Sequence, residues 1–477
     1  MLPVNANIVT VTSWHPQLEG RDGPRYQALA DAIADAVGSG ALQPGAKLPP
    51  MRDLAWKLGV TVGTVGRAYA LAEQRRLVSG QVGRGTYVLD ARAADPASAD
   101  LPSVGDGTID MTRNVPVMAG QTAALAESLA ALARKPGLGA LLNYMPDGGL
   151  PAYREAGAAW LGRVGLDLAP ERIVLTGGAQ HALAVSVLAL ARPGDTVLTE
   201  EMTFAGVRNA VRLVGARPLG VAMDEQGALP EAIDRAARET GAKLVFLTPT
   251  IHSPTTAMMS RERRRAIAEV LRYRDLVLIE DDVYGFLPRE RPAPIAALAP
   301  EHTIYLASVS KCLAPGLRLA WIAPPARLRE RMIETVHSTA LALPAFSAEI
   351  VTRWIADGTA ARLVDELRAE IAARHAIATR ALAGLSWRGR PDAMHAMIDM
   401  PVGWRAGDFT DAAARNRIAV CPAQAFALDP AGAPNAIRVT LGATQDRATL
   451  ERALGTIAQL AASPSADPAE TMRRRIV

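Results

Sequence analysis

The segment SVSKCLAPGLRLAW, residues 308–321, places a lysine and an arginine seven residues apart in a loop rich in small and turn-forming residues. It overlaps the end of the apolar run TIYLAS, which predicts a buried strand. Lys311 at that strand end can act as a nucleophilic amine. Arg318 can donate charged hydrogen bonds to a phosphate, and Ser308 and Ser310 add hydroxyl groups. These residue types predict a lysine that carries a carbonyl cofactor beside a phosphate-binding loop.

A second phosphate-binding element is predicted earlier in the chain. The residues TGGAQ follow an apolar run and open a helical pattern. The backbone N–H groups of Gly178, Ala179 and Gln180 can therefore hold phosphate at a positively polarised helix start. A pyridoxal phosphate (PLP) site needs such a cradle in addition to the lysine.

PLP also needs an acid at its ring nitrogen and a wall for its ring. EDDVY ends another apolar run, so Asp281 is placed at a strand end with Tyr284 one turn on. Phe204, in EEMTFAG, can stack on the ring. Each feature alone has an ordinary explanation: a glycine turn, a core phenylalanine or a solvated acidic strand end. Their order on successive predicted strands favours the cofactor site.

The elements that would position these residues alternate along the chain. RIVLTGG, DTVLTE, KLVFLTP, LVLIEDD and TIYLAS predict buried strands, and helical patterns such as QHALAVSVLALA and RERRRAIAEVLRY lie between them. This alternation predicts an α/β domain with a mostly parallel sheet over residues 110–465. The only cysteines are Cys312 and Cys421, so we expect no metal site, no disulfide framework and a reducing cytoplasm.

A separate unit is predicted at the N-terminus. The stretch 90–109 is rich in Ala, Asp, Pro, Ser and Gly, which predicts a linker after a domain at 1–89. Within that domain, MRDLAWKLG ends at a glycine that predicts a helix stop, and Thr61 can cap the next helix. LVSGQVGRGTYV then predicts two short strands around a glycine-rich turn. The pattern is that of a helix-turn-helix followed by a wing.

Charge is concentrated in this small unit. The 477-residue chain has a net charge of only +4, whereas Asp53 and Glu73 alone oppose the basic residues between positions 47 and 84. A phosphate-contacting surface fits this clustering, although a solvated helical face would also produce it. The basic residues are Lys47, Arg52, Lys57, Arg67, Arg75, Arg76 and Arg84.

The sequence of residues 25–89 resembles the GntR-type winged helix, from the Pro44-Gly45 turn to the glycines of the wing. The resemblance implies DNA contacts by Arg52, by Thr61 and Thr64 at the start of the second helix, and by Gly85 in the wing. One position departs from the family pattern, because Val62 stands where an arginine is usual. Arg67 is the candidate replacement.

Residues 110–460 resemble the fold-type I aminotransferases, through SVSKCLAPGLRLAW, NYMPDGGLPAYREAGAAWL, LTPTIHSPTT and NAIRVTLG. The resemblance implies that Arg438 receives a substrate carboxylate, that Tyr284 bonds the cofactor ring oxygen, and that Asn114 and Tyr144 line the substrate or phosphate side. Two departures occur. The usual Asn-Pro-Thr-Gly is SPTT here, so Ser253 or His252 is the candidate replacement for the asparagine. The ring wall is phenylalanine rather than tyrosine.

Together these two resemblances imply the architecture of the MocR/GabR-type transcriptional regulators. The expected protein is a cytoplasmic bacterial regulator that binds promoter DNA, carries PLP as an aldimine on Lys311 and senses an amino compound there. A homodimer, with its subunits arranged head to tail, is expected, and no membrane partner. Two alternatives stay open: a genuine aminotransferase with an accessory N-terminal domain, and a sensor of PLP itself.

Overall fold

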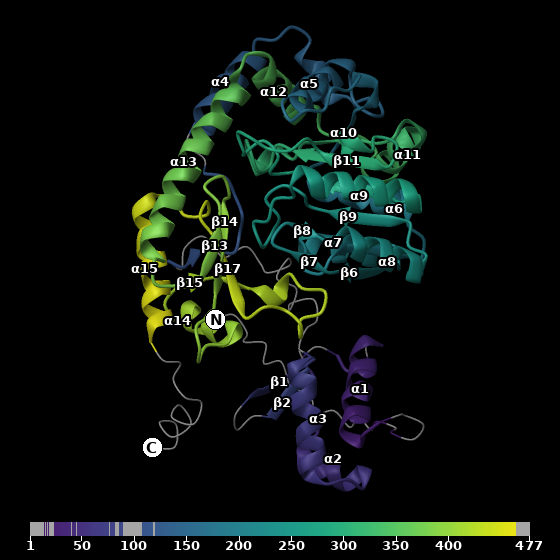
Figure 1. Ribbon diagram of the computed structural model, residues 1–477, viewed down its shortest axis with the longest axis vertical. Helices are drawn as coiled ribbons and strands as arrows, with labels where there is room; N and C mark the ends of the chain where they lie inside the picture. The colour runs from purple at the N-terminus through teal and green to yellow at the C-terminus, as the bar shows by residue number, and fades with distance from the viewer. Residues whose placement is uncertain are drawn as a thin grey trace, which may run out of the picture. The chain divides into compact units, whose positions relative to one another are not determined.

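The computed structural model describes residues 14, 16, 18, 23–39, 41–43, 45–75, 77–81, 85–88, 107–117 and 120–463. The chain divides into two compact units, Met1–Ser103 and Val104–Val477 (Figure 1). Most of the predicted linker lies outside the described residues, as do Arg76, Gly83 and Arg84, so the domain boundaries 1–89, 90–109 and 110–465 stay predictions. In the described part of the chain, no helix is both long and apolar enough to cross a membrane.

The small unit contains three helices and a hairpin. Gly59 ends the second helix with a left-handed backbone (φ 61°), and the Thr61 side chain caps the third by accepting the N–H of Thr64 at 3.1 Å. Leu54 and Val65 are fully buried between the helices. The elements are α1 (Arg25–Gly38), α2 (Met51–Leu58), α3 (Val62–Gln74), and the antiparallel pair β1 (Val78–Gln81) and β2 (Gly85–Val88).

The large unit is built on a seven-stranded sheet in the order β4-β12-β11-β10-β9-β5-β6. Neighbours from β11 through to β6 are parallel, and only β12 runs antiparallel to both of its neighbours. The predicted α/β class with a mostly parallel sheet is therefore confirmed. The strands are β4 (Val174–Thr176), β5 (Thr196–Glu200), β6 (Arg217–Val221), β9 (Leu244–Leu247), β10 (Val277–Asp281), β11 (Thr303–Ser308) and β12 (Ala320–Ala323).

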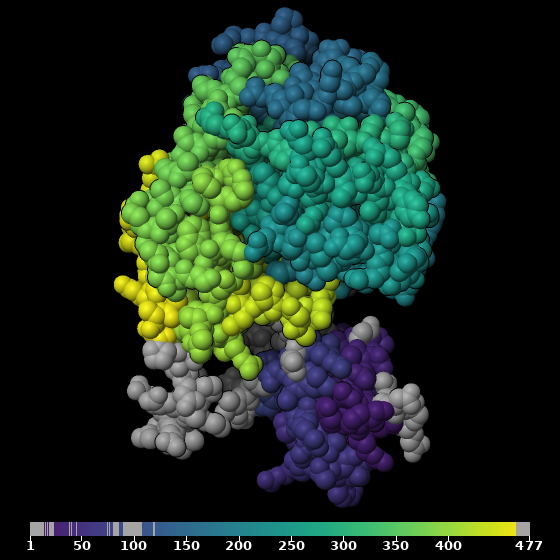
Figure 2. Space-filling view, viewed as in Figure 1, coloured from purple at the N-terminus to yellow at the C-terminus, as the bar shows by residue number. Residues whose placement is uncertain are grey.

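Helices cover this sheet, and one long helix, α13, runs along the side of the large unit toward a second, smaller sheet (Figure 1). In the space-filling view, the teal sheet region and the green-to-yellow C-terminal region form one continuous body (Figure 2). The helices are α4 (Gln121–Leu132), α5 (Pro151–Gly162), α6 (Ala179–Leu190), α7 (Ala205–Leu213), α8 (Pro230–Thr240), α9 (Arg261–Arg274), α10 (Ile295–Leu298), α11 (Arg329–Ala340), α12 (Ala345–Ala356), α13 (Thr359–Ala381), α14 (Ala406–Arg415) and α15 (Arg447–Ala462).

The smaller sheet has the order β13-β14-β17-β16 and packs with α13, α14 and α15 around a separate apolar cluster. Its strands are β13 (Trp387–Gly389), β14 (His395–Asp399), β16 (Cys421–Pro422) and β17 (Ala436–Thr440). The chain enters this region at β3 (Ile109–Asp110), which pairs with β15 (Ile418–Ala419) and begins at the last residue of the predicted linker. Two short strands, β7 (Met223–Asp224) and β8 (Gly227–Ala228), form a hairpin beside the large sheet.

A glycine sets how closely the segment after β3 approaches β17. Gly442 is buried, and a Cβ atom there would lie 2.3 Å from the carbonyl oxygen of Val115. We expect Gly442→Ala to push this backbone away and to lower the free energy of unfolding by about 1–3 kcal/mol. Denaturant titration checks the change. The control Gly455→Ala, in α15 with no atom within 4 Å of the new methyl group, should instead stabilise by about 0.5–1 kcal/mol. Equal effects of the two substitutions would contradict this account.

Candidate functional site

The predicted cofactor residues lie at the carboxyl ends of strands in the large sheet. Asp281 is the last residue of β10, Lys311 follows β11, and Gly178 follows β4. Phe204 follows β5 and directly precedes α7. Because the carboxyl ends of parallel strands meet at one edge, loops from distant parts of the sequence converge there.

The predicted phosphate side is assembled by Gly178 and Arg318. Gly178 has φ +90° and precedes the first turn of α6, and a Cβ atom there would lie 2.6 Å from Nη2 of Arg318. Arg318 itself has a left-handed backbone (φ 46°) and donates to the carbonyl oxygen of Gly177 at 3.4 Å. Only glycine accommodates both this conformation and this approach. The structure thus brings together an exposed guanidinium and the start of α6 at Ala179. The backbone N–H of Gly178, which was predicted to hold phosphate, donates instead to the carbonyl oxygen of Thr176 at 2.9 Å.

The two serines of the lysine loop hold its backbone. The hydroxyl of Ser308 donates to Oγ of Ser310 at 3.1 Å and accepts the backbone N–H of Ser310 at 3.2 Å. Both side chains are buried next to Lys311. Their contacts fix the turn from β11 into the lysine loop, and a phosphate role for their hydroxyl groups stays a prediction.

Lys311 is half-buried and Asp281 is buried, and both have shifted pKa values. Burial, followed by the positive charges of Arg438 and Arg318, lowers the pKa of Lys311 to about 8, against the opposing effect of Asp281. Burial, followed by the charge of Asp282, raises the pKa of Asp281 to about 7. A cation beside Asp281 would offset both causes, and a protonated pyridine nitrogen is such a cation.

Asn114 connects Lys311 to the residues opposite it. Its backbone carbonyl accepts a hydrogen bond from Nζ of Lys311. Its side-chain nitrogen lies 2.8 Å from the hydroxyl of Tyr284 and 2.9 Å from Nδ1 of His395. The other ring nitrogen of His395 meets the carbonyl oxygen of His252 at 3.1 Å. Asn114 therefore contacts Lys311, Tyr284 and His395, and its role at a substrate or phosphate stays a prediction.

The two candidate replacements for the usual asparagine have different partners. Ser253 contributes a side-chain hydrogen bond to Tyr284, whereas Nδ1 of His252 lies 2.8 Å from the hydroxyl of Thr255. Ser253 is thus the one of the two that contacts the tyrosine. His395 was missed in the sequence because it lies in the apolar strand β14, where a histidine between hydrophobic neighbours was the available signal.

Arg438 is buried, with its side chain directed to the segment before Asn114. Its Nη2 donates to the carbonyl oxygen of Thr112, and its guanidinium lies 4.7 Å from the ring centre of Phe426. The charge of Asp110 raises the pKa of Arg438, but the carboxylate of Asp110 forms its ion pair with Arg113 at 3.6 Å. Among the residues that the structure describes, Arg438 has no carboxylate ion-pair partner, and its Nε has no hydrogen bond. Within the part of the chain that the structure describes, no internal salt bridge neutralises this guanidinium.

Several buried polar atoms at the site have no partner within the described chain: Oδ1 of Asn114, Nε2 of His252 and Nε of Arg438. Such atoms are costly unless a ligand or water satisfies them. With the glycine cradle at Gly178 and the buried acid Asp281, they fit a phosphorylated pyridine cofactor. Within the described part of the chain, no cluster of three His, Cys, Asp or Glu side chains that could hold a metal is found.

Three predicted residues lie toward the outside of the single chain. Phe204 is 41% exposed, and its ring covers Gly206, where a Cβ atom would lie 2.2 Å from the ring. The Gln180 side chain donates to the carbonyl oxygen of Gly206 at 3.3 Å. Tyr144 is 81% exposed and is not brought to the site within one chain.

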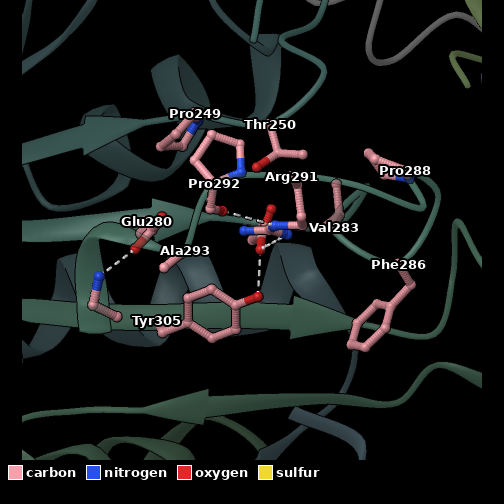
Figure 3. A network of polar contacts seen from close by, with 12 residues as sticks. Pro249, Thr250, Glu280, Val283, Phe286, Pro288, Arg291, Pro292, Ala293 and Tyr305 are labelled. Carbon is pink, nitrogen blue, oxygen red and sulfur yellow. Dashed lines mark hydrogen bonds and ion pairs between the residues drawn. The ribbon is translucent and has the colours of Figure 1, made fainter. Parts of the chain in front are cut away.

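Three consecutive carboxylates end β10 and all are buried. Glu280 accepts the backbone N–H groups of Ile295 and Ala296 at 3.0 and 2.8 Å. Asp282 accepts Nη1 of Arg291 at 2.5 Å and the hydroxyl of Tyr305. Figure 3 shows the Arg291 and Tyr305 side chains meeting at this point. Asp281, between them in sequence, is left for the cofactor site.

The predicted DNA-binding residues lie on exposed parts of α2, α3 and the hairpin. Arg52 is exposed on α2, whereas the hydroxyls of Thr61 and Thr64 lie 2.9 Å apart at the start of α3. Arg67 is also exposed, and its guanidinium lies 5.2 Å from the ring centre of Tyr26. Gly85 has φ +118°, and a Cβ atom there would lie 2.5 Å from Lys47.

Comparison with known proteins agrees with this division. Residues 107–457 match the family described as aminotransferase class I and II, and residues 25–88 match the bacterial regulatory proteins of the gntR family. The chain belongs to the aminotransferase class I and II family. A GntR-type domain joined to an aminotransferase-like domain is the predicted MocR-type architecture, so this prediction is confirmed. The prediction of PLP as the cofactor of this family is also confirmed.

The relatives of this aminotransferase-family chain include both regulators and enzymes. An uncharacterised HTH-type transcriptional regulator from Bacillus subtilis, YdeF, is 28% identical over 96% of this chain and 99% of its own length. The vitamin B6 salvage pathway transcriptional repressor PtsJ from Salmonella typhimurium is 31% identical over 65% of this chain and 71% of its own. The solved structure of LysN, an α-aminoadipate aminotransferase from Thermus thermophilus, has a TM-score of 0.68 and 23% identity and covers 78% of this chain and 94% of its own.

The pKa of Lys311 leads to a pH prediction for cofactor capture. Only the neutral amine is a nucleophile, so the rate at which cofactor-free protein takes up PLP covalently should rise about tenfold per pH unit and level off above about pH 8. Arg438→Gln removes a positive charge that lowers this pKa, so its profile should shift to higher pH. Stopped-flow absorbance measures both rates, and Lys311→Ala controls for non-covalent uptake. A midpoint near that of free lysine would contradict the prediction.

Proposed function

We propose that this protein is a bacterial transcriptional regulator that binds promoter DNA through its winged helix and senses an amino compound at the PLP site around Lys311. The observation that carries the proposal is the winged helix itself, whose α2 and α3 present Arg52 and Arg67 at an exposed surface. An aminotransferase has no chemical use for such a unit. The regulator relatives that span nearly the whole chain support the same conclusion.

The chemistry of the site suggests the class of effector. The positive charge of buried Arg438 is close enough to lower the pKa of half-buried Lys311. Arg438 has no carboxylate ion-pair partner among the described residues. A molecule with a primary amine could exchange at Lys311, and an acidic group on the same molecule could pair with Arg438. The planar guanidinium can hold a carboxylate through two parallel hydrogen bonds.

When bound, PLP supplies a carbonyl that exchanges one amine for another. The chain's own residues then have separate tasks. Asp281 would hold the positive ring nitrogen, and Phe204 would cover the ring. The N–H groups of Ala179 and Gln180 at the start of α6, with Arg318, would hold the phosphate. Burial raises the pKa of Tyr284 to about 12, so its hydroxyl keeps its proton and can donate to the ring oxygen.

Two alternatives have specific support. A 2-aminoadipate transaminase from Thermus thermophilus is 27% identical over 68% of this chain, which favours some enzymatic turnover. The relative PtsJ, a vitamin B6 salvage pathway transcriptional repressor, favours a sensor of PLP itself. Titration of the PLP-loaded protein with amino acids, followed by absorbance, separates the three. Exchange without keto-acid product supports amine sensing, product supports an enzyme, and no exchange leaves the PLP sensor.

The proposed regulator is a cytoplasmic homodimer with its subunits head to tail. Exposed apolar side chains near the start of the large unit support an interface there. Leu142, in the short 3-10 helix Leu138–Leu142, is 80% exposed, and the adjoining Tyr144 is 81% exposed. A partner subunit that covered these residues would also bring Tyr144 toward a second site.

DNA binding should depend on salt and on Arg52. The logarithm of affinity should fall against the logarithm of salt concentration with a slope of about −0.9 for each phosphate neutralised. Arg52→Ala should weaken binding and reduce that slope, whereas Arg25→Ala, which removes an exposed charge from α1, should change neither strongly. Fluorescence anisotropy with promoter DNA measures both. Unchanged promoter binding by a chain without residues 1–89 would refute the assignment.

Arg438→Lys should separate sensing from cofactor binding. The substitution keeps the charge but loses the planar fork, so the affinity of the effector should fall by about 1–3 kcal/mol. PLP binding and DNA binding without effector should survive. Spectral titration and a reporter assay in cells measure the two responses. A loss of thermal stability with an unchanged effector response would remove Arg438 from the effector site.

A further inference from the structure

A second polar cavity lies in the large unit, between α5, the loop that follows β10, and α13. Its volume is about 280 Å³. One wall is aromatic, because Trp160 and Phe286 stack there with ring centres 4.8 Å apart. Figure 3 shows Phe286 and Arg291, which both line the cavity. None of these residues belongs to the predicted cofactor or effector set.

Four arginines line this cavity: Arg163, Arg289, Arg291 and Arg368. Only two carboxylates pair with them. Asp282 binds Arg291 at 2.5 Å, and Asp365 lies 2.9 Å from Arg368 and 3.7 Å from Arg289. Arg163 lies over the ring of Trp160 at 5.2 Å and has no carboxylate ion pair within the described ranges. The lining therefore carries an excess of positive charge.

Arg291 is the least exposed of the four and is not fully bonded. Its side chain is 7% exposed, Nη1 binds Asp282, and Nε donates to the carbonyl oxygen of Pro292 at 3.3 Å. Its Nη2 is buried and has no hydrogen-bond partner among the described residues. A buried guanidinium N–H without an acceptor is costly, so this nitrogen marks where an acceptor is needed.

Arg368 contributes charge but few free donors. It donates to the carbonyl oxygens of Phe286, Leu287 and Pro288 at 2.7, 3.0 and 3.3 Å, so α13 holds the loop that forms the cavity wall. Arg163 and Arg289 are exposed at the cavity and have donors to spare. A planar, strongly charged donor set of this kind matches the oxygens of phosphate or carboxylate.

We propose that this cavity is a second anion site, which binds a small oxyanion through Arg291, Arg163 and Arg289. Its ligand is inorganic phosphate or a short metabolite that carries a phosphoryl or carboxylate group. The site is separate from the predicted cofactor phosphate site at Gly178 and does not depend on the proposed regulatory function. The stacked rings leave an apolar wall for an organic part of the ligand.

The test uses full-length, PLP-saturated protein, so that the cofactor phosphate site is already filled. Inorganic phosphate is titrated at constant ionic strength by isothermal calorimetry. Arg163→Gln combined with Arg289→Gln removes two exposed donors without touching the buried Arg291–Asp282 pair. The control combines Arg265→Gln with Arg331→Gln, which removes the same charge from exposed positions on α9 and α11. Circular dichroism and thermal melting confirm that both variants fold.

Wild type and control should bind phosphate, and the cavity variant should bind it at least about tenfold more weakly. The same titration with glycerol 3-phosphate and with succinate identifies the source of the oxyanion: the tightest of the three ligands names the phosphate ion, a phosphorylated metabolite or a carboxylate. Equal binding of all three ligands to wild type and cavity variant would overturn the proposal. So would the absence of binding of any of them to wild type.

Discussion

The site depends on three charged side chains, two buried and one half-buried, that lie close together and are not fully compensated by the residues that the structure describes. Removal from water disfavours the charged form of each group. It lowers the pKa values of Lys311 and Arg438 and raises the pKa of Asp281. The negative charge of Asp281 stabilises the charged form of Lys311, whereas the positive charge of Arg438 destabilises it. A folded protein tolerates such a set where ligands supply the missing charges. One missing charge is positive, next to Asp281, and another is negative, next to Arg438. That pair of needs is the physical reason for proposing that cofactor and effector bind at one site.

The charged groups are held in place by polar contacts from several distant segments. Asn114 bonds Tyr284 and His395 with its side chain and Lys311 with its backbone, so the segment after β3 reaches both sheets. Burial lowers the pKa of His395 to about 3, so the ring is neutral and one of its nitrogens can accept a hydrogen bond. The loss of the usual asparagine before Pro254 is therefore accommodated by Ser253 and Asn114, which both bond Tyr284. The close approach at Gly442 keeps this segment in position.

Local sequence rules predicted the elements whose pattern is strong. The five apolar runs became β4, β5, β9, β10 and β11, and Gly59 and Thr61 ended and capped the helices as expected. The strands β13, β14 and β16 were not predicted, because their pairing in the smaller sheet joins segments far apart in the chain. Asp281 and Lys311 were predicted because they lie at the ends of apolar runs in an order that suits a PLP site, and Arg438 was predicted from the resemblance to the aminotransferases. His395 and the Thr112 carbonyl were not, because a partner's identity depends on tertiary contacts that no local pattern contains.

The three acids at the end of β10 show how one strand serves several purposes. Side chains alternate in direction along a strand, so neighbouring residues reach different surroundings. Glu280 satisfies backbone N–H groups at the start of α10, Asp281 is left for the cofactor, and Asp282 is neutralised by Arg291 and Tyr305. The pairing of Asp282 matters for its neighbour, because the charge of Asp282 raises the pKa of Asp281. By neutralising Asp282, Arg291 limits the repulsion between Asp282 and Asp281. Arg291 also lines the second cavity, so the carboxylate of Asp282 connects the electrostatics of that cavity with those of the predicted cofactor site.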